Sequence, residues 1–269
     1  MYPNFKDKYL GKSLFEPSDF LKKYRGKGLK APETVIICYQ RSVVNFAVSR
    51  LNAVLEKKFI VPFYRLGEKL GLCHSPIGAP AAAAEMEELI ALGAKRFISF
   101  GTAGGLSEKL KHGGAVLCEK ALRDEGTSHH YLKPAKFSYP DAAFTGELEN
   151  ILSSKKIPFV KGPSWTIDAP YRETPEELVE YGKEGILTVE MEAAAIFAVA
   201  EYRKVRAAGI FVISDILREK GWQPGFHFKD VKKNLEGLLE LLSKNLGSFV
   251  IIVDIFWDSA IRNADGFLV

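Results

Sequence analysis

The chain has 269 residues, of which 47% are hydrophobic and 26% charged, a composition that excludes disordered, collagen-like and low-complexity proteins. Its formal net charge of +4 is spread along the chain. It lacks the clustered basic patch expected of a nucleic-acid-binding protein, but it suits a small anionic substrate such as phosphate. Cys38, Cys73 and Cys118 have neither zinc-site nor disulfide-framework spacing, so we expect a reducing, cytoplasmic location. Residues 1–10 are polar and no apolar run spans a bilayer, so we expect neither a signal peptide nor a membrane partner.

Apolar segments with strand and helix periodicity alternate along the chain. In the first half we predict a strand at Thr34–Tyr39, a helix over Ser42–Glu56, paired strands within Phe59–Cys73, a helix over Ala81–Leu92 capped by Gly93, a strand at Arg96–Phe100, a glycine-rich turn at Gly101–Leu106 and a strand at Ala115–Leu122. In the second half we predict helices over Asp141–Ser154, Met191–Tyr202 and Asp230–Leu246, and strands at Ile157–Lys161, Ile186–Val189 and Val205–Ser214. Thr174, Pro175 and Glu177 form a capping-box pattern that begins a further helix.

This alternation favours an α/β fold, with a mostly parallel sheet covered by helices on both faces. No linker rich in Pro, Gly or Ser divides the chain. We therefore expect a single domain over residues 1–269, with its core at about 34–246 and a C-terminal extension at 247–269. The apolar run Phe249–Trp257 in that extension fits either an extra strand or a surface for a partner subunit.

Two segments have the residue types of a binding site for an anion and a sugar. Glycines at Gly101–Gly105 follow a strand directly, so backbone N–H groups could turn toward an anion, and Thr102 adds a hydroxyl. A plain tight turn is the alternative. Glu190, Met191 and Glu192 lie at a strand-to-helix junction, where parallel sheets bind ligands. A carboxylate there could accept hydrogen bonds from the two hydroxyls of a ribose, or the acids could simply favour the helix N-terminus.

Two further segments could contact a planar ring. Asp215 ends a buried strand, where partial desolvation would suit a general acid; a capping role is the alternative. Trp165, Tyr171 and Arg172 lie in one segment after a strand and could stack on a ring and bind its edge, or they could form a packed loop.

The adjacent residues His129 and His130 do not predict a metal site, because neighbours on a strand point to opposite faces. We expect His130 and Tyr131 to line a pocket instead.

The order of these segments resembles the nucleoside phosphorylase family that includes hexameric purine nucleoside phosphorylase and uridine phosphorylase. The resemblance runs from about Thr34 to Leu246, and its most specific part is Val189–Ala195 followed by Ser214-Asp215. Gly78-Ala79-Pro80 and Gly101–Gly104 strengthen it. It implies a three-layer α/β/α domain with a mixed, partly barrel-like central sheet, a homo-oligomer (dimer or hexamer), and phosphorolysis of a nucleoside to free base and ribose 1-phosphate, without a metal or organic cofactor.

The resemblance also implies roles for individual residues. Glu192 would hold the ribose hydroxyls and Met191 would pack against the sugar, with Glu190 beside them. Asp215 would act as general acid toward the base, which favours a purine over uridine. The remaining expected contacts are with phosphate (Gly101, Thr102 and Arg41) and with the base (Tyr171, Arg172 and Trp165).

The sequence departs from the family pattern where phosphate would bind. The usual glycine-aspartate-proline loop is replaced by Cys38–Arg41, and Ser99 stands where an arginine is usual. Arg65, Arg172 or an arginine of a neighbouring subunit could compensate. This departure keeps open a nucleosidase of the same fold that uses water, acting on a methylthioadenosine- or AMP-type substrate. It also keeps open a non-catalytic nucleoside-binding protein.

Overall fold

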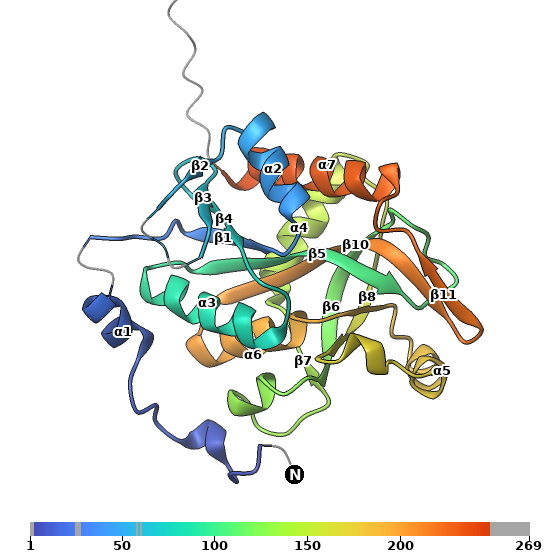
Figure 1. The fold of residues 1–269 in the computed structure, drawn as a ribbon, viewed down its shortest axis with the longest axis horizontal. Helices are drawn as coiled ribbons and strands as arrows, with labels where there is room; N and C mark the ends of the chain where they lie inside the picture. The colour runs from blue at the N-terminus through green and yellow to red at the C-terminus, as the bar shows by residue number, and fades with distance from the viewer. Residues whose placement is uncertain (1–2, 25–27, 58, 60, 248–269) are drawn as a thin grey trace, which may run out of the picture.

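A computed structural model describes residues 3–24, 28–57, 59 and 61–247 (Figure 1). Its strands are β1 (Thr34–Cys38), β2 (Val54–Leu55), β3 (Phe63–Arg65), β4 (Leu70–His74), β5 (Arg96–Gly105), β6 (Ala115–Asp124), β7 (Phe137–Ser138), β8 (Phe159–Ile167), β9 (Thr188–Glu190), β10 (Arg206–Arg218) and β11 (Gly221–Pro224). Its α-helices are α1 (Pro17–Tyr24), α2 (Arg41–Arg50), α3 (Ala79–Ala91), α4 (Ala142–Ser154), α5 (Pro175–Lys183), α6 (Ala193–Arg203) and α7 (Lys229–Leu246). Short 3₁₀ turns are η1 (Lys8–Leu10), η2 (Ser128–His130) and η3 (Pro170–Arg172).

The central sheet is mixed, and part of it closes into a barrel. Strands β5, β10, β6, β8 and β9 pair in a ring, because β9 pairs with β5 and β5 pairs with β10. From β5 the sheet continues through β1, β4, β3 and β2. Most paired residues lie in parallel ladders, as predicted, through β1–β4, β1–β5, β5–β10, β6–β8 and β8–β9. The sheet is mixed because β5–β9, β6–β10 and the β3–β4 and β10–β11 hairpins are antiparallel. The partly barrel-like sheet implied by the family resemblance is confirmed.

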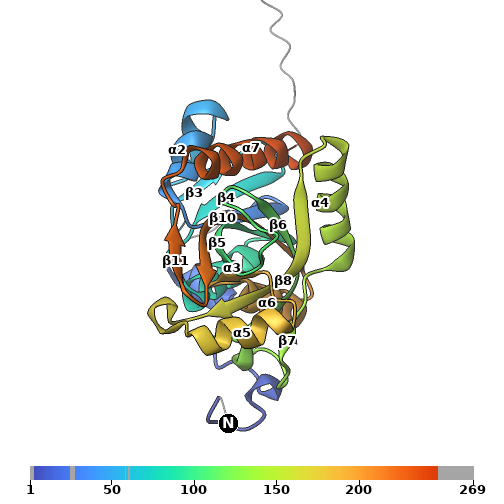
Figure 2. The same cartoon turned by 90° about the vertical axis from the view of Figure 1, so that its right-hand side faces the viewer.

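Helices cover the sheet on two sides, which gives three layers. In Figure 1, α2 and α7 lie above the strands, and α3 and α6 lie below them. Figure 2 shows α4 running beside β8 at the edge of the upper layer. Separate apolar clusters fill the two spaces. One joins α2, α4 and α7 to the sheet through residues such as Val43, Phe144 and Leu239. The other joins α3 and α6 to the opposite face through Met86 and Phe197.

Helix α6 is buried on all sides, and its composition explains how it fits there. Every residue from Ala193 to Ala200 is buried, and five of these eight residues are alanines, which let neighbouring backbones approach closely. The helix contacts α3, β6, β8 and β10. This packing holds the first turn of α6, and the residues just before it, in a fixed position beside the strand ends.

Most predicted elements are present, with three corrections. The glycine-rich segment Gly101–Gly105 continues β5 as a strand and is not a turn. Strand β8 extends to Ile167, so Trp165 lies in a strand. Strand β10 extends past Asp215 and turns back as β11. The capping box at Thr174 and Glu177 is confirmed. Gly93, predicted to cap the helix, follows α3 with a positive φ of 109°. The apolar run Phe249–Trp257 lies outside the described residues.

Candidate active site

The ends of several strands converge on one pocket of about 210 Å³. Its walls come from the segment after β1, the end of β5, the β9–α6 junction, the end of β10 and the loop before α5. The lining residues are Tyr39, Gln40, Ile77, Thr102, Ala103, Gly104, Pro170, Glu173, Val189, Glu190, Met191, Glu192, Ser214, Asp215 and Phe226. The structure thus brings together residues of all four segments singled out in the sequence, although Thr102 and Asp215 are more than a hundred residues apart in the chain.

Glu192 sits immediately before α6 with its carboxyl group almost fully buried. Its Oε1 accepts a hydrogen bond of 2.7 Å from the backbone N–H of Gly78, a glycine with φ of 113° at the start of α3. Burial, followed by repulsion from Glu190, raises the pKa of Glu192 to about 8, and the bond from Gly78 opposes this rise. Hydroxyl donors on a bound ligand would stabilise the ionised form of this carboxyl group.

The carboxyl group of Glu190 is hydrogen-bonded within the protein. It lines the pocket, but Oε1 accepts hydrogen bonds from the hydroxyls of Thr166 and Ser164 at 2.5 and 3.3 Å. Its Oε2 accepts bonds of 2.8 and 2.7 Å from the backbone N–H groups of Glu192 and Ala193. Burial raises its pKa, and these four donors oppose that rise. These four donors occupy its acceptor positions, so Glu190 fixes the first turn of α6 and hence Glu192. The expected contact of Glu190 with ribose stays a prediction.

Asp215 faces the pocket from β10 and is held by two side chains. Ser214 Oγ donates to Oδ1 at 2.7 Å, and Trp222 Nε1 donates to Oδ2 at 2.8 Å. Trp222 lies on β11, where Leu217 pairs with it across the hairpin. Gly104 permits the close approach of this hairpin, because a Cβ at that position would meet Leu217 Cδ1 at 2.4 Å.

The end of β5 is covered by side chains from the segment after β1. Gln40 Nε2 donates to Thr102 Oγ1 at 3.1 Å, and Tyr39 Oη lies 3.0 Å from Ser99 Oγ. A Cβ on Gly101 would meet Tyr39 at 2.8 Å and Gln40 at 3.2 Å. Thr102 lines the pocket as expected, whereas Tyr39 and Gln40 cover Gly101.

Among the described residues, no basic side chain lines this pocket, whereas four acidic side chains do. Arg41 is exposed at the start of α2, outside the lining; it lies near enough to His74 to help lower the pKa of that side chain, which burial lowers most. Arg65 forms an ion pair with Glu56. Arg172 is exposed and also lies outside the lining. The expected phosphate contact of Arg41 stays a prediction.

The aromatic residues expected at the base lie elsewhere. Trp165 is fully buried in a cluster with Ile186 and Val189, and its indole N–H donates to Asp124 Oδ2 at 2.9 Å. Tyr171 is 99% exposed. Strand pairing turns Trp165 into the core and η3 turns Tyr171 outward, and neither of them nor Arg172 lines the pocket. Their expected contacts with a base stay predictions. From this segment Pro170 and Glu173 line the pocket instead.

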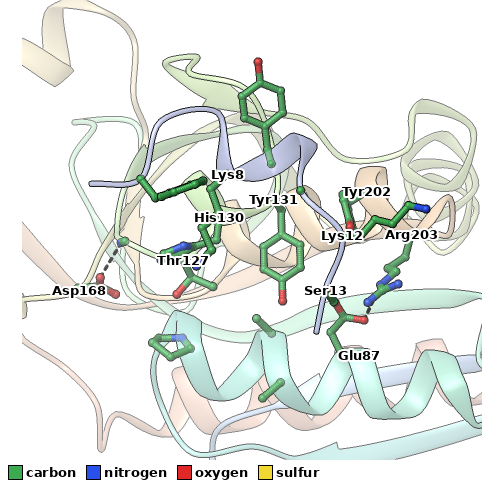
Figure 3. Close-up of a pocket in the computed structure, with 17 residues that line it drawn as sticks. Lys8, Lys12, Ser13, Glu87, Thr127, His130, Tyr131, Asp168, Tyr202 and Arg203 are labelled. Carbon is green, nitrogen blue, oxygen red and sulfur yellow. Dashed lines mark hydrogen bonds and ion pairs between the residues drawn. The ribbon is translucent and has the colours of Figure 1, made fainter. Parts of the chain in front are cut away.

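A larger cavity, of about 690 Å³, lies where the N-terminal segment packs against α3, α6 and the loop after β6. Its labelled side chains are shown in Figure 3. His130 and Tyr131 line this cavity, as predicted. Arg203 in its wall is paired with Glu87 at 2.7 Å and Glu16 at 2.9 Å. Because Thr102, Glu192 and Asp215 do not line it, we place the candidate active site in the smaller pocket.

The residues that sequence reasoning missed are Gln40, Glu173 and Trp222. Trp222 and Gln40 reach the site only through a hairpin and a chain turn that the sequence did not reveal. Glu173 had a detectable signal, since it directly precedes the predicted capping box. A cluster of side chains that could hold a metal ion is absent from residues 3–24, 28–57, 59 and 61–247. In the same ranges, no helix has the length and apolarity needed to cross a membrane.

Known proteins are similar to this chain in sequence and in fold. The family model of the phosphorylase superfamily matches residues 49–244. Guanosine phosphorylase of Halorubrum lacusprofundi is 33% identical over 147 residues, which make up 55% of this chain and 61% of that protein. The matched part of the chain thus spans about three fifths of that relative. Purine nucleoside phosphorylase of Plasmodium vivax is 28% identical over 179 residues, covering 65% of this chain and 72% of that one.

Solved structures agree with these matches. Uridine phosphorylase from Vibrio fischeri superimposes with a TM-score of 0.70 at 25% identity, covering 80% of this chain and 92% of that chain. Purine nucleoside phosphorylase from Toxoplasma gondii, in complex with immucillin-H, gives a TM-score of 0.72 at 20% identity, covering 80% and 90%. The second likeness concerns the fold alone.

Proposed function

Because this chain belongs to the phosphorylase superfamily, we propose that it cleaves the N-glycosidic bond of a nucleoside with phosphate, giving the free base and ribose 1-phosphate. The observation that carries the proposal is that Glu192 and Asp215, from two different elements, line one pocket together with Thr102 and Met191. The relatives named as guanosine, purine nucleoside and uridine phosphorylases support the same reaction.

The sugar would lie against the β9–α6 junction. Glu192 offers a buried carboxyl group that can accept hydrogen bonds from neighbouring ribose hydroxyls, and Met191 supplies a half-buried apolar surface beside it. As the base departs, the sugar gains positive charge. Acidic groups around it stabilise that charge more in the transition state than in the ground state, which is the requirement for catalysis.

The base would lie toward Asp215. A purine leaves more readily when its ring is protonated, and Asp215 is placed to act as the general acid at a ring nitrogen. Ser214 and Trp222 fix the plane of its carboxyl group, so the orientation is set before substrate binds. We therefore propose a purine nucleoside as the preferred substrate, with uridine as the alternative.

Hydrolysis by a water molecule is a second candidate, favoured by a specific feature of the site. Gln40 Oε1 is buried without a hydrogen-bond partner among the described residues, next to Thr102 and Gly101 where phosphate would bind. An unpaired acceptor there favours a donor such as water over an anion. Phosphorolysis would need a cationic side chain in the pocket. Arg41 could supply it if its side chain moved into the pocket, or a second copy of the chain could supply it.

The proposed reaction needs no metal or organic cofactor, because phosphate is a co-substrate and the acid is a side chain. We further propose a homo-oligomer, a dimer or hexamer, in which a neighbour supplies the cation that the described pocket lining lacks. A cytoplasmic location is part of the proposal and is supported by three buried free thiols, which suit a reducing compartment.

Product analysis tests the proposal. The purified protein would be incubated with inosine, guanosine, adenosine and uridine, with and without phosphate, and the base and sugar products separated by chromatography. Base plus ribose 1-phosphate, formed only with phosphate, supports phosphorolysis. Base plus free ribose without phosphate supports the water reaction. Failure to cleave any of these nucleosides contradicts the proposed function.

A further inference from the structure

The β10–β11 hairpin carries Trp222, and its strand pairing stops beside the acid that Trp222 holds. The ladder between the two strands ends at the pair Asp215–Pro224. In Figure 1, β11 lies at the outer edge of the molecule, and all four of its residues are exposed. A short, exposed edge strand opens at a low cost in free energy. A fixed position of Trp222 therefore requires support from outside the hairpin.

His112, in the loop between β5 and β6, supplies this support. Its Nε2 atom lies 3.1 Å from the backbone oxygen of Gln223, the residue that follows Trp222 in β11. Because a carbonyl oxygen can only accept, Nε2 carries the hydrogen and donates it. The hydrogen bond thus holds the chain one residue away from the indole that contacts Asp215.

The chain that follows β11 encloses the imidazole ring of His112. The ring centroid of Phe228 lies 4.8 Å from that of His112. Gly225 makes this packing possible, because a Cβ at that position would meet His112 Cδ2 at 2.3 Å and the backbone oxygen of Ser214 at 2.8 Å. The enclosing segment includes Phe226, which lines the candidate active site. His112 therefore contacts the chain on both sides of a pocket residue.

The backbone that carries His112 is itself attached to β10, just ahead of the acid. The N–H of Gly113 donates to the oxygen of Ile213 at 2.8 Å, and the N–H of Ile213 donates to the oxygen of Gly114 at 2.9 Å. His112 thus connects two parts of the chain that flank Asp215, one shortly before it in β10 and one beyond the hairpin turn. Movement of the hairpin relative to the acid requires this connection to break.

We infer that His112 is a positioning residue for the proposed reaction: it holds β11, β11 holds Trp222, and Trp222 fixes the carboxyl group of Asp215. The inference rests on the proposed function, in which Asp215 protonates a purine. His112 does not line the pocket, so it acts through the chain and not on the substrate. A misplaced acid slows the chemical step, because proton transfer depends on its geometry.

A double-mutant cycle between His112 and Trp222, measured with inosine, tests the inference. His112→Leu removes the donor and should lower kcat about 3–10-fold, the effect of one lost hydrogen bond, with KM changed less than about twofold. His112→Gln should keep kcat within about twofold of the parent, because its amide also offers an N–H donor. In a Trp222→Phe background, His112→Leu should cost less than about twofold, since the connection to Asp215 is already broken.

Lys111→Ala is the matched control, because Lys111 is the exposed neighbour of His112 and lies outside the lining of the candidate active site. It should leave kcat unchanged. An unchanged kcat in folded His112→Leu would overturn the inference. So would losses from His112→Leu and Trp222→Phe that simply multiply in the double variant, because independent effects show that the two residues do not act through one another.

NMR of the ¹⁵N-labelled protein tests the connection without turnover. The indole N–H signal of Trp222, assigned by its absence from Trp222→Phe, should exchange with solvent about threefold or more faster in His112→Leu, because the hairpin opens more often. Unchanged exchange would overturn the connection from His112 to Trp222 at any level of activity. Faster exchange in a protein that cleaves no nucleoside would overturn the proposed function and leave that connection standing.

Discussion

Trp222 Nε1 donates a 2.8 Å hydrogen bond to Oδ2 of Asp215 across the β10–β11 hairpin. Trp222 is 57% exposed, so an exposed residue of the neighbouring strand β11 holds the acid proposed to protonate the base. The carboxyl group is thereby fixed from two sides, by Ser214 within the same strand and by Trp222 from the next.

Replacing Trp222 by Phe should lower kcat/KM for purine nucleosides about 10-fold, the effect of losing one hydrogen bond to a charged group worth about 1.5 kcal/mol. Phe keeps an aromatic ring in place of the indole, and only the donor is lost. Steady-state kinetics with inosine provides the measurement. Gln223→Ala, an exposed neighbour outside the pocket lining, should leave the rate unchanged. An unaltered rate in Trp222→Phe would show that Asp215 does not need this partner.

Asp215→Asn should lower kcat for purine nucleosides by about 10²–10⁴-fold, the usual contribution of a general acid. The amide retains the bond from Trp222 but cannot deliver the proton. Uridine, whose ring lacks the purine imidazole nitrogen, should lose less. Parallel kinetics on inosine and uridine measure the difference. Equal losses on both substrates would mean that Asp215 acts on the sugar or on the fold rather than on the base.

Glu192→Gln should change how thermal stability depends on pH. Because the pKa of Glu192 is raised from 4.5 to about 8, the folded protein keeps a proton that the unfolded chain releases above its lower pKa. Stability from this group is thus present below about pH 4.5 and is lost as pH rises to about 8. The variant lacks this loss, so its Tm should match that of the parent near pH 5 and exceed it near pH 8.5.

For a chain of this length, each kcal/mol added to the free energy of unfolding raises Tm by about 2–4 °C. Calorimetric scans at both pH values measure it, and turnover at pH 7 should fall at least 10-fold in the same variant, because one carboxylate acceptor is lost. A Tm difference that is the same at both pH values would show that Glu192 is not held protonated in the empty site.

Glu190→Gln should destabilise the fold by about 3 kcal/mol, since an amide turns its NH₂ group toward donors that need an acceptor. Two of the four donors are the backbone N–H groups of Glu192 and Ala193 at the start of α6, so kcat should fall as Glu192 shifts. Urea unfolding gives the free energy, with Glu176→Gln as the exposed-acid control. A variant with parental stability and reduced activity would return Glu190 to a direct role at the ribose.

Local sequence patterns predicted the elements well, because they depend on neighbours along the chain. The capping box at Thr174 and the periodicity of α7 are examples. Closure of the barrel was not predictable from residue patterns, since the antiparallel pairing of β9 with β5 joins only Thr188 and Val189 to Gly105 and Gly104. The resemblance to a known family supplied that feature.

Part of the site was predictable, because the ends of strands can be located from the sequence. Met191 and Glu192 follow the buried strand β9, and Asp215 lies in the last part of β10. Strand ends meet at the edge of a sheet. The sequence analysis placed Trp165 in a loop, where an aromatic side chain could contact a base. In the structure Trp165 lies in β8 and is fully buried. Gln40 and Trp222 reach the pocket through tertiary contacts with Thr102 and Asp215, which no local pattern encodes.

The reverse reaction tests the central claim most directly. Hypoxanthine would be incubated with ribose 1-phosphate, and inosine and released inorganic phosphate followed together by chromatography and phosphorus NMR. Phosphorolysis is reversible, so the account predicts equal amounts of inosine and phosphate, lost in Asp215→Asn. Absence of both products with the folded protein, under conditions where it cleaves inosine to free ribose, would contradict phosphorolysis and assign the reaction to water.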